Sequence, residues 1–225
     1  DLPGAGNSRF TTNTPLTIDH HIHSVRRALD LLELRDVAVV GHDSGGMIAR
    51  HAVAGDARLR ALGLIDTEQS TGLSWKFKSF IAGRRVPGFG AALGWLAGRP
   101  RLRRNRLVLG DAFADRSLLD GEFDEFFLQP LHRSRTHRDA AIRLLKSFDH
   151  QHVRDLAELH RQIDVPVQLV WGEEDRFFPV EWAREMVADF PDAQLEVIAG
   201  AGLFSHEERP AEVARALLPV LANTR

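Results

Sequence analysis

Apolar residues recur at helical spacing in the first clearly patterned part of the chain, residues 18–34. A helix there would carry on one face Ile18, Ile22, Val25, Leu29 and Leu32. Thr17 precedes this stretch as a candidate N-cap, and Asp19 falls in the first turn, where a negative charge is favourable. The spacing therefore predicts an amphipathic helix.

A short β-branched run follows and ends in glycine. Val37–Val40 has the length of a buried strand, Gly41 closes it, and Gly45-Gly46 opens a second apolar pattern at helical spacing. The order predicted here is a strand, a sharp turn and a helix. A second buried strand is predicted over Leu62–Ile65.

From residue 68 to about residue 160 the regular alternation stops. This segment is rich in glycine, arginine and phenylalanine, and we interpret it as a helical insertion. Alternation then resumes with a strand over 165–171, a helix over 181–189, a strand over 194–198 and a closing helix over 210–221. Strands that alternate with helices are typical of a parallel sheet flanked by helices, so the predicted fold class is α/β.

Composition narrows the classes of partner. The 225 residues carry a formal net charge of −2, which supplies no field that would attract nucleic acid or an anionic membrane. We therefore expect a small-molecule substrate, with neither nucleic acid nor membrane as a partner. The absence of cysteine excludes disulfides and thiolate chemistry. No signal peptide or membrane span of about 20 apolar residues is recognisable, so a cytoplasmic location is the default expectation.

Two polar clusters receive no predicted function. His20, His21 and His23 lie in the first predicted helix without a matched carboxylate pair, so we interpret them as a solvated face and predict no metal. The arginine-dense run over 98–106 is likewise interpreted as a solvated face. No cofactor is predicted.

The turn after the first predicted strand carries the candidate chemistry. Gly41-His42-Asp43-Ser44-Gly45 has the spacing of a nucleophile elbow, in which small residues stand two positions before and two after the reactive residue. Gly41 and Gly45 stand at those positions around Asp43, whereas centring the motif on Ser44 would require a small residue at His42. A carboxylate at Asp43 can attack a saturated carbon, and the backbone N–H of Ser44 is a candidate oxyanion donor. The alternative is a glycine-rich turn that binds a phosphate or nothing.

Together with the loop Asp1–Ser8, the candidate elbow resembles the corresponding segments of the α/β-hydrolase superfamily. Within that superfamily, His42-Asp43 resembles the aspartate-nucleophile branch, which comprises epoxide hydrolases and haloalkane and haloacetate dehalogenases. The resemblance covers 1–67 and 161–225, which it implies are two parts of one core, with 68–160 as a helical cap. It further implies that the family's N-terminal strands are missing from this chain, and three alternatives stay open: another segment supplies them, they belong to the protein but not to this chain, or they were lost in evolution. A homodimer is an alternative that the resemblance leaves open.

The segment Trp171–Pro179 resembles the family's loop in which an aspartate orients the catalytic histidine. The resemblance places that acid at Asp175. Glu173 and Glu174 in the same loop remain alternatives, and so does Asp66, which follows the preceding strand.

The segment Gly202–Pro210 resembles the family's histidine loop but lacks its histidine. When Phe204, Glu208 and Pro210 are aligned with the family pattern, Leu203 occupies the position of the catalytic base. Leucine cannot accept a proton. His206 lies three residues further on and is the candidate substitute base.

The resemblance implies a hydrolase that acts on a small, mostly apolar substrate through an ester on Asp43. Because a carboxylate is ionised without help but water needs a base, we expect ester formation to proceed and ester hydrolysis to be impaired. His42, Trp75 and Trp95 are expected to contact substrate. The chain has no tyrosine, the residue with which epoxide hydrolases of this branch polarise the epoxide oxygen. The alternatives are a serine-type or His206-assisted esterase or lactonase, and a ligand-binding pseudoenzyme without turnover.

Overall fold

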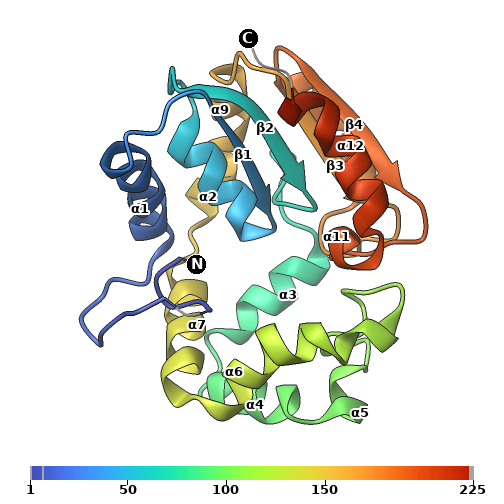
Figure 1. Ribbon diagram of the computed structural model, residues 1–225. Coiled ribbons are helices and arrows are strands. Elements are labelled where there is room, and N and C mark those ends of the chain that lie inside the picture. The colour runs from blue at the N-terminus through green and yellow to red at the C-terminus, as the bar shows by residue number, and fades with distance from the viewer. Residues whose placement is uncertain (1, 7, 223–225) are drawn as a thin grey trace.

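A four-stranded parallel sheet forms the centre of the computed structural model, which describes residues 2–6 and 8–222 (Figure 1). The strands lie side by side in chain order: β1 (Val37–His42), β2 (Leu59–Ile65), β3 (Val167–Gly172) and β4 (Ala193–Ile198). All three pairings are parallel, so all four carboxyl ends meet at one edge of the sheet. Asp1 and Asn7, in the loop that resembles the family, lie outside the described residues.

Helices cover both faces of the sheet. On one face α12 (Pro210–Ala222) packs Val213 and Leu217 against Ile65 and Val170. On the other face lie α1 (Ile18–Leu31), α2 (Ser44–Val53), α9 (Leu156–Arg161) and α10 (Val180–Met186), with α10 followed by the short helix η3 (Val187–Asp189). The predicted parallel sheet flanked by helices is confirmed.

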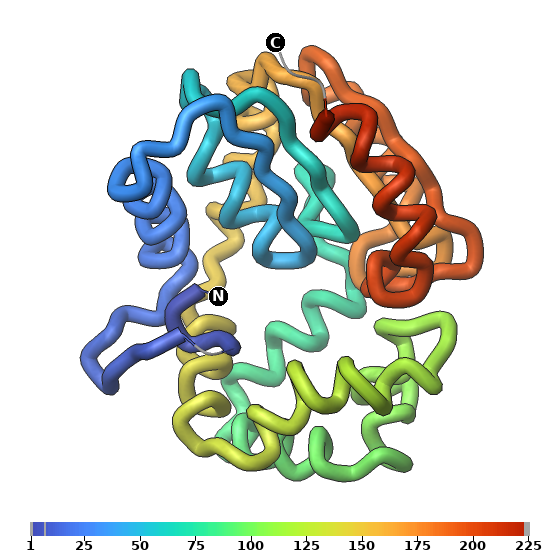
Figure 2. The backbone as a smooth tube through the Cα atoms, in the orientation of Figure 1, coloured from blue at the N-terminus to red at the C-terminus, as the bar shows by residue number. Residues whose placement is uncertain are grey.

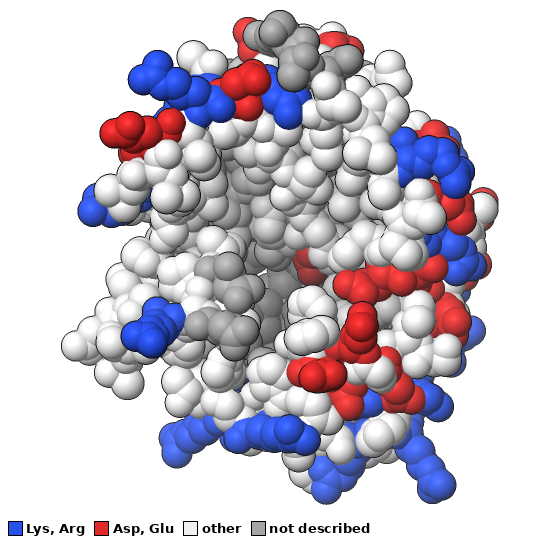
Figure 3. Space-filling model, viewed as in Figure 1, with Lys and Arg blue, Asp and Glu red and all other residues white. Residues whose placement is uncertain are grey.

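A group of helices faces the carboxyl ends of the strands (Figures 1 and 2). It consists of α3 (Trp75–Gly83), α4 (Phe89–Ala97), α5 (Pro100–Arg103), η1 (Arg116–Leu119), η2 (Asp124–Leu128), α6 (Gln129–Arg133) and α7 (Arg135–Ser147). The short α8 (His150–Arg154) leads from α7 to α9 and so back to the sheet. Figure 3 shows the molecule hollowed between the strands and these helices, with basic side chains along the lower edge of the helical part.

The apolar pattern located every predicted strand and helix of the core to within a few residues. Thr17 is the N-cap of α1, and its hydroxyl accepts a hydrogen bond of 3.1 Å from the backbone N–H of His20. The helix ends at Leu31 and not at residue 34, because the backbone turns at Glu33, whose φ is +49°. Leu32 consequently lies outside the helix and is 67% exposed.

Among the described residues β1 pairs only with β2 and is therefore an edge strand. Val40 on this strand is 45% exposed, which is unusual for a large apolar residue in a parallel sheet. The strands expected upstream of β1 remain a prediction. In the part of the chain that the structure describes, no helix combines the length and the apolar character needed to cross a bilayer.

Candidate active site

Asp43 occupies the turn between β1 and α2, in a backbone conformation that few non-glycine residues adopt. Its φ is +49° and its ψ is −136°. Its N–H donates to the carbonyl oxygens of Ile65 (3.3 Å) and Asp66 (3.1 Å), which ties the turn to the end of β2. The strained residue of the elbow is thus Asp43 and not Ser44, which already belongs to α2.

Two glycines allow the turn to close, but they are not the pair that the motif suggested. A Cβ on Gly41 would stand 2.6 Å from the Cα of Gly46, and a Cβ on Gly46 would stand 2.5 Å from Thr67 Oγ1. A Cβ on Gly45 would meet nothing within 4 Å. The steric requirement assigned to Gly45 is therefore wrong, and it falls on Gly46, because α2 presents its second glycine to β1 and to Thr67.

The Asp43 carboxylate lies at the N-terminus of α2. The N–H of Ser44 donates to its Oδ1 at 2.7 Å, and no hydrogen bond to its Oδ2 is seen among the described residues. Burial raises the pKa of Asp43 to about 6, although the hydrogen bonds from Ser44 act in the opposite direction. Asp43 is therefore ionised at neutral pH, with one oxygen held and the other available to react.

A second carboxylic acid, Glu68, lies beside Asp43 and is fully buried. Its Oε1 accepts a hydrogen bond of 3.0 Å from the hydroxyl of Ser44, whose oxygen also lies 3.4 Å from Asp43 Oδ1. Burial and, after it, the charge of Asp43 raise the pKa of Glu68 to about 7, while the charge of Arg50 opposes this rise. An ionised Asp43 therefore disfavours ionisation of Glu68.

Arg50 of α2 is a buried cation behind this pair, with 0% of its surface exposed. One of its terminal nitrogens, Nη2, donates to Thr67 Oγ1 at 2.9 Å and to the carbonyl oxygen of Glu68 at 2.8 Å. The other, Nη1, lies 3.1 Å from His160 Nε2. Burial and the charge of Arg50 lower the pKa of His160 to about 2, so His160 is neutral and accepts this hydrogen bond.

Asp175 and Asp66 differ in how many of their oxygens are occupied. Asp175 Oδ1 accepts hydrogen bonds from the N–H groups of Phe177 (2.7 Å) and Phe178 (3.0 Å), but its buried Oδ2 has no partner. Both Asp66 oxygens are engaged, Oδ1 by the N–H of Gly172 at 2.7 Å and Oδ2 by the N–H and hydroxyl of Ser205. A buried oxygen without a partner is what an absent histidine donor would leave, so the geometry fits Asp175 better than Asp66 as the orienting acid.

Burial also affects the ionisation of Asp175. Burial raises its pKa to about 8, and the charge of Asp43 adds to the rise. The two other acids in this loop, Glu173 and Glu174, are exposed.

We expect the free energy of unfolding to fall as the pH rises from about 4 to about 8, and to fall less steeply in Asp175→Asn. The folded chain holds a proton on Asp175 that the unfolded chain, with the ordinary pKa of 3.8, releases. This stabilisation is complete below the unfolded pKa and is lost as the pH rises through about 8, with a slope of at most about 1.4 kcal/mol per pH unit. Urea unfolding at about pH 5 and about pH 7.5 measures both slopes. Equal slopes for the two proteins would contradict a protonated Asp175.

The loop that carries Leu203 is pinned against the end of β3. The N–H of Glu174 donates to the carbonyl oxygen of Ala201 at 2.8 Å, and a Cβ on Gly172 would stand 2.1 Å from the carbonyl oxygen of Gly202. Leu203 follows directly and is 5% exposed. The position aligned with the catalytic histidine thus lies in a loop packed beside Asp175, filled by an apolar side chain.

The ring of His206 lies against that of His42, and its Nε2 is 3.8 Å from Oε1 of the adjacent Glu207. The two rings lie 4.3 Å apart between centroids, and His42 Nε2 lies 2.9 Å from the carbonyl oxygen of Leu203. Burial, followed by the neighbouring His42, lowers the pKa of His206 to about 3. A base this weak accepts a proton from water poorly, which argues against His206 as the substitute base.

Asp43 and Ser44 open into an apolar cavity of 280 Å³ between the sheet and the helices opposite it. They are the only polar residues among the 15 described residues that line it. The others are Ile18, Phe77, Phe80, Leu93, Ala97, Leu109, Leu128, Leu131, Ala141, Ile142, Leu144, Leu145 and Phe148.

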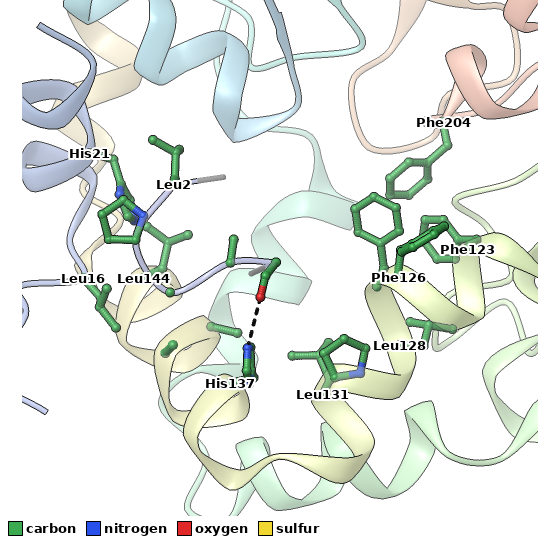
Figure 4. Close-up of a pocket in the computed structure, with 18 residues that line it drawn as sticks. Leu2, Leu16, His21, Phe123, Phe126, Leu128, Leu131, His137, Leu144 and Phe204 are labelled. Carbon is green, nitrogen blue, oxygen red and sulfur yellow. Dashed lines mark hydrogen bonds between the residues drawn. The ribbon is translucent and has the colours of Figure 1, made fainter. Parts of the chain in front are cut away.

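A second cavity of 360 Å³ shares four of these side chains, Leu128, Leu131, Ala141 and Leu144. Figure 4 shows Phe123, Phe126 and Phe204 on one side of it and His21 and Leu2 on the other. His137 stands at its floor, with Nε2 3.4 Å from the carbonyl oxygen of Gly6. The two cavities are therefore neighbours on either side of a shared apolar wall, and of the two only the first is lined by Asp43.

The tryptophans expected at the substrate site lie elsewhere. Trp75 is 74% exposed and Trp95 is 50% exposed, and neither lines the cavity at Asp43 or the cavity beside it. Arg99 lies over the ring of Trp95 at 3.7 Å from its centroid, which accounts for an aromatic ring at the surface. His42, adjacent to Asp43, is absent from the lining of both cavities as well.

Glu68 and Arg50 were not predicted from the sequence as members of the site. Glu68 comes three residues after β2, the position at which parallel strands deliver functional side chains, and this was the one signal available. Arg50 looked like an ordinary helix residue. Among the described residues, no group of three or more histidine, aspartate or glutamate side chains is arranged to hold a metal ion.

A model of the alpha/beta hydrolase fold family matches residues 1–210. The uncharacterized hydrolase YugF of Bacillus subtilis is 26% identical over 211 residues, which are 93% of this chain and 74% of that protein. A 2-hydroxy-6-oxononadienedioate/2-hydroxy-6-oxononatrienedioate hydrolase of Cupriavidus pinatubonensis is 23% identical over 224 residues, 99% of this chain and 75% of that protein.

Solved structures of other proteins share this fold. The epoxide hydrolase CorEH superimposes with a TM-score of 0.76 at 18% identity, covering 99% of this chain and 80% of that chain. The meta-cleavage product hydrolase CumD of Pseudomonas fluorescens IP01 superimposes with a TM-score of 0.75 at 18% identity, covering 99% and 79%. At such identities the likeness establishes the fold and leaves the chemistry to the site.

Proposed function

Because the chain belongs to the alpha/beta hydrolase fold family, we propose that it is a hydrolase in which Asp43 attacks a saturated carbon of a small, neutral, apolar substrate. The Asp43 oxygen displaces a halide or opens an epoxide, and an ester joins the substrate carbon to the Asp43 carboxyl group. Water then cleaves this ester and releases an alcohol.

One observation carries the proposal: the strained residue at the N-terminus of α2 is a carboxylate that opens into an apolar cavity. The N–H of Ser44 holds Asp43 Oδ1, which leaves Oδ2 to attack. A low-polarity cavity removes the water that would shield the carboxylate, so the attacking oxygen is poorly solvated. Ser44 is the weaker candidate nucleophile, since its hydroxyl donates to Glu68 and belongs to α2.

The composition of the cavity wall favours one class of substrate. A carboxylate substrate, such as a haloacetate or the dienedioate in the name of the Cupriavidus relative, would need a cation nearby. Among the described residues that line the cavity at Asp43 there is no lysine, arginine or histidine. Its 280 Å³ is close to the lower limit of about 300–1,000 Å³ that is usual for ligand sites. These features favour a small neutral haloalkane or epoxide.

The second step is the slow one in this proposal. With Leu203 in the position of the base, no imidazole of the described residues is hydrogen-bonded to Asp175 Oδ2 to activate water, and the carboxyl ester persists. His206 does not replace it, because its ring lies against His42 and its pKa is lowered to about 3 by burial.

The origin of the product oxygen tests the aspartate route. When Asp43 Oδ2 attacks carbon and water later attacks the Asp43 carboxyl carbon, the oxygen of the first alcohol released comes from the protein. A single turnover in ¹⁸O-water is expected to give unlabelled alcohol and a labelled Asp43. Labelled alcohol in the first turnover would point to direct attack by water and would overturn the proposal.

Ala141 lies in the wall shared by the two cavities. A larger side chain at this position should therefore limit the length of the substrates that the chain accepts. We expect Ala141→Phe to lower kcat/KM at least about tenfold for substrates long enough to reach the second cavity, and to affect the shortest substrates least. Ala91→Phe, on the exposed side of α4, is the matched control. A uniform loss across chain lengths in Ala141→Phe would contradict this assignment of the cavities.

A further inference from the structure

Around Asp43 and Glu68, the Thr67 hydroxyl oxygen lies within hydrogen-bonding distance of two other oxygens but has only one hydrogen to donate. The Thr67 hydroxyl has one hydrogen, yet its oxygen lies 2.7 Å from the Asp43 carbonyl oxygen and 3.1 Å from Glu68 Oε2. When that hydrogen points along the shorter contact, the 3.1 Å contact is favourable only if Glu68 Oε2 carries a hydrogen itself. Thr67 therefore fits a protonated Glu68 in the free chain.

The balance of charge agrees with this count. Among the described residues, the cation that faces the pair is Arg50, which is fully buried, and His160 beyond it is neutral. One negative charge shared by Asp43 and Glu68 neutralises Arg50, whereas two would leave an unpaired buried charge. Asp66, two residues before Glu68, is directed away, toward Gly172 and Ser205.

Ser44 is the link between Glu68 and the cavity. Glu68 does not line the cavity, but Ser44 does, and its hydroxyl donates to Glu68 Oε1 at 3.0 Å. A water molecule in the cavity can donate to Ser44 Oγ, so one chain of hydrogen bonds would run from water to Glu68.

We propose that Glu68, acting through the Ser44 hydroxyl, accepts the proton of the water that hydrolyses the Asp43 ester and thus serves the step that Leu203 leaves without a base. The inference rests on the proposed function, because it requires that ester. Water gives a proton to Ser44 Oγ while Ser44 gives its own to Glu68 Oε1, and the hydroxide adds to the Asp43 carboxyl carbon. The bond from that carbon to the substrate oxygen then breaks, and the departing alkoxide receives the proton back through Ser44.

Formation of the ester itself prepares the relay. Ionised Asp43 raises the pKa of Glu68, and an esterified Asp43 carries no charge, so Glu68 loses this contribution while Arg50 continues to favour its ionised form. Glu68 then gives up its proton through the Ser44 hydroxyl to a water molecule in the cavity, and it is a carboxylate when a base is needed. Such a relay is a weaker device than an imidazole in contact with water, since the base is a carboxylate that acts through a second group.

Decay of the alkyl ester on Asp43 tests the relay. The ester is formed with a short neutral haloalkane, excess reagent is removed, and the remaining adduct is followed by intact-protein mass between about pH 5 and about pH 9. In the unaltered chain we expect the decay rate to rise with pH, with a midpoint below the value of about 7 for Glu68 in the free chain. In Glu68→Gln we expect decay to slow by about 100-fold and to lose that midpoint.

Two variants separate proton transfer from support of the structure. Glutamine keeps an oxygen for the Ser44 hydroxyl and has a nitrogen to donate to Thr67, so a merely structural Glu68 would leave the pH profile in place. Ser44→Ala interrupts the relay with Glu68 intact and should flatten the profile as well, which provides the test if Glu68→Gln folds poorly. Glu174→Gln, at an exposed position, should decay as the unaltered chain does.

The outcomes are distinguishable. A normal pH profile in Glu68→Gln or in Ser44→Ala overturns the relay while leaving Asp43 as the nucleophile. If no adduct forms on Asp43 in the unaltered chain, the proposed function itself fails and the relay fails with it.

Discussion

Replacing Leu203 with histidine is expected to raise the rate of Asp43 ester hydrolysis by about 10²- to 10⁴-fold, the usual contribution of a positioned general base. Leu203 lies in a loop held against the end of β3, and Asp175 Oδ2 is buried there without a partner. A histidine at this position can donate to Asp175 through one ring nitrogen and accept a proton from water through the other. The hydrogen bond would also favour the ionised form of Asp175 and lower its raised pKa.

Leu203→Asn is the matched control for this substitution. Asparagine has the same number and branching of side-chain heavy atoms as leucine and can donate to Asp175, but it cannot accept a proton from water. If Leu203→Asn accelerates hydrolysis as much as Leu203→His, the gain comes from polarity at this position and not from a base. If neither variant changes the rate, the alignment that places the catalytic position at Leu203 is wrong.

Asp43→Asn is expected to lower kcat by on the order of 10⁴-fold or more, because a neutral amide cannot form the ester. The same change should stabilise the chain at neutral pH. Burial raises the pKa of Asp43 to about 6, so folding above that pH has to bury a carboxylate that the unfolded chain keeps in water. Removing the charge should therefore gain roughly 1–3 kcal/mol in the free energy of unfolding.

Activity and stability should thus change in opposite directions in Asp43→Asn, which separates loss of the nucleophile from loss of the fold. Steady-state kinetics and urea unfolding at about pH 7.5 measure the two quantities. Asp164→Asn, at an exposed aspartate, should change neither. Retained turnover in Asp43→Asn would favour a serine-type route through Ser44.

Hydrophobic spacing was sufficient to predict the core because the core is regular. The β-branched run before Gly41 became β1, and the alternating strands and helices after residue 165 became β3, α10, β4 and α12. These elements are set by local periodicity, which the sequence displays directly. The helices between residues 75 and 147 were foreseen only as a class, because their short lengths and irregular packing leave no sustained period.

The site was predictable only where residues lie close together in sequence. The elbow around Asp43 could be read from five consecutive residues, but the tight glycine turned out to be Gly46 and not Gly45. Contacts between distant segments could not be read in this way. The Ser44–Glu68 hydrogen bond spans 24 positions, and the pairing of Arg50 with His160 spans 110. Such pairings depend on which strands become neighbours and on which side chains of each helix point into the interior.

Trp75 and Trp95 were predicted to contact substrate, but neither lines the cavity at Asp43. Large aromatic residues in a helical insertion are reasonable candidates for a pocket wall, but both rings lie at the surface, where cationic side chains contact them. The cavity at Asp43 is instead lined by leucines, isoleucines, alanines and phenylalanines spread along several helices, and no single one of them marks the site in the sequence.

The most direct test of the central claim is the intact mass of the chain after incubation with a short neutral haloalkane or epoxide, followed by peptide mapping. The account predicts a mass increase equal to the alkyl group (for an epoxide, the whole epoxide), located on Asp43, that persists in the Leu203 chain and is short-lived in Leu203→His. An adduct on Ser44 would contradict the aspartate mechanism. Reversible binding of these compounds without an adduct in either form would contradict catalysis altogether and identify the cavity as a binding site.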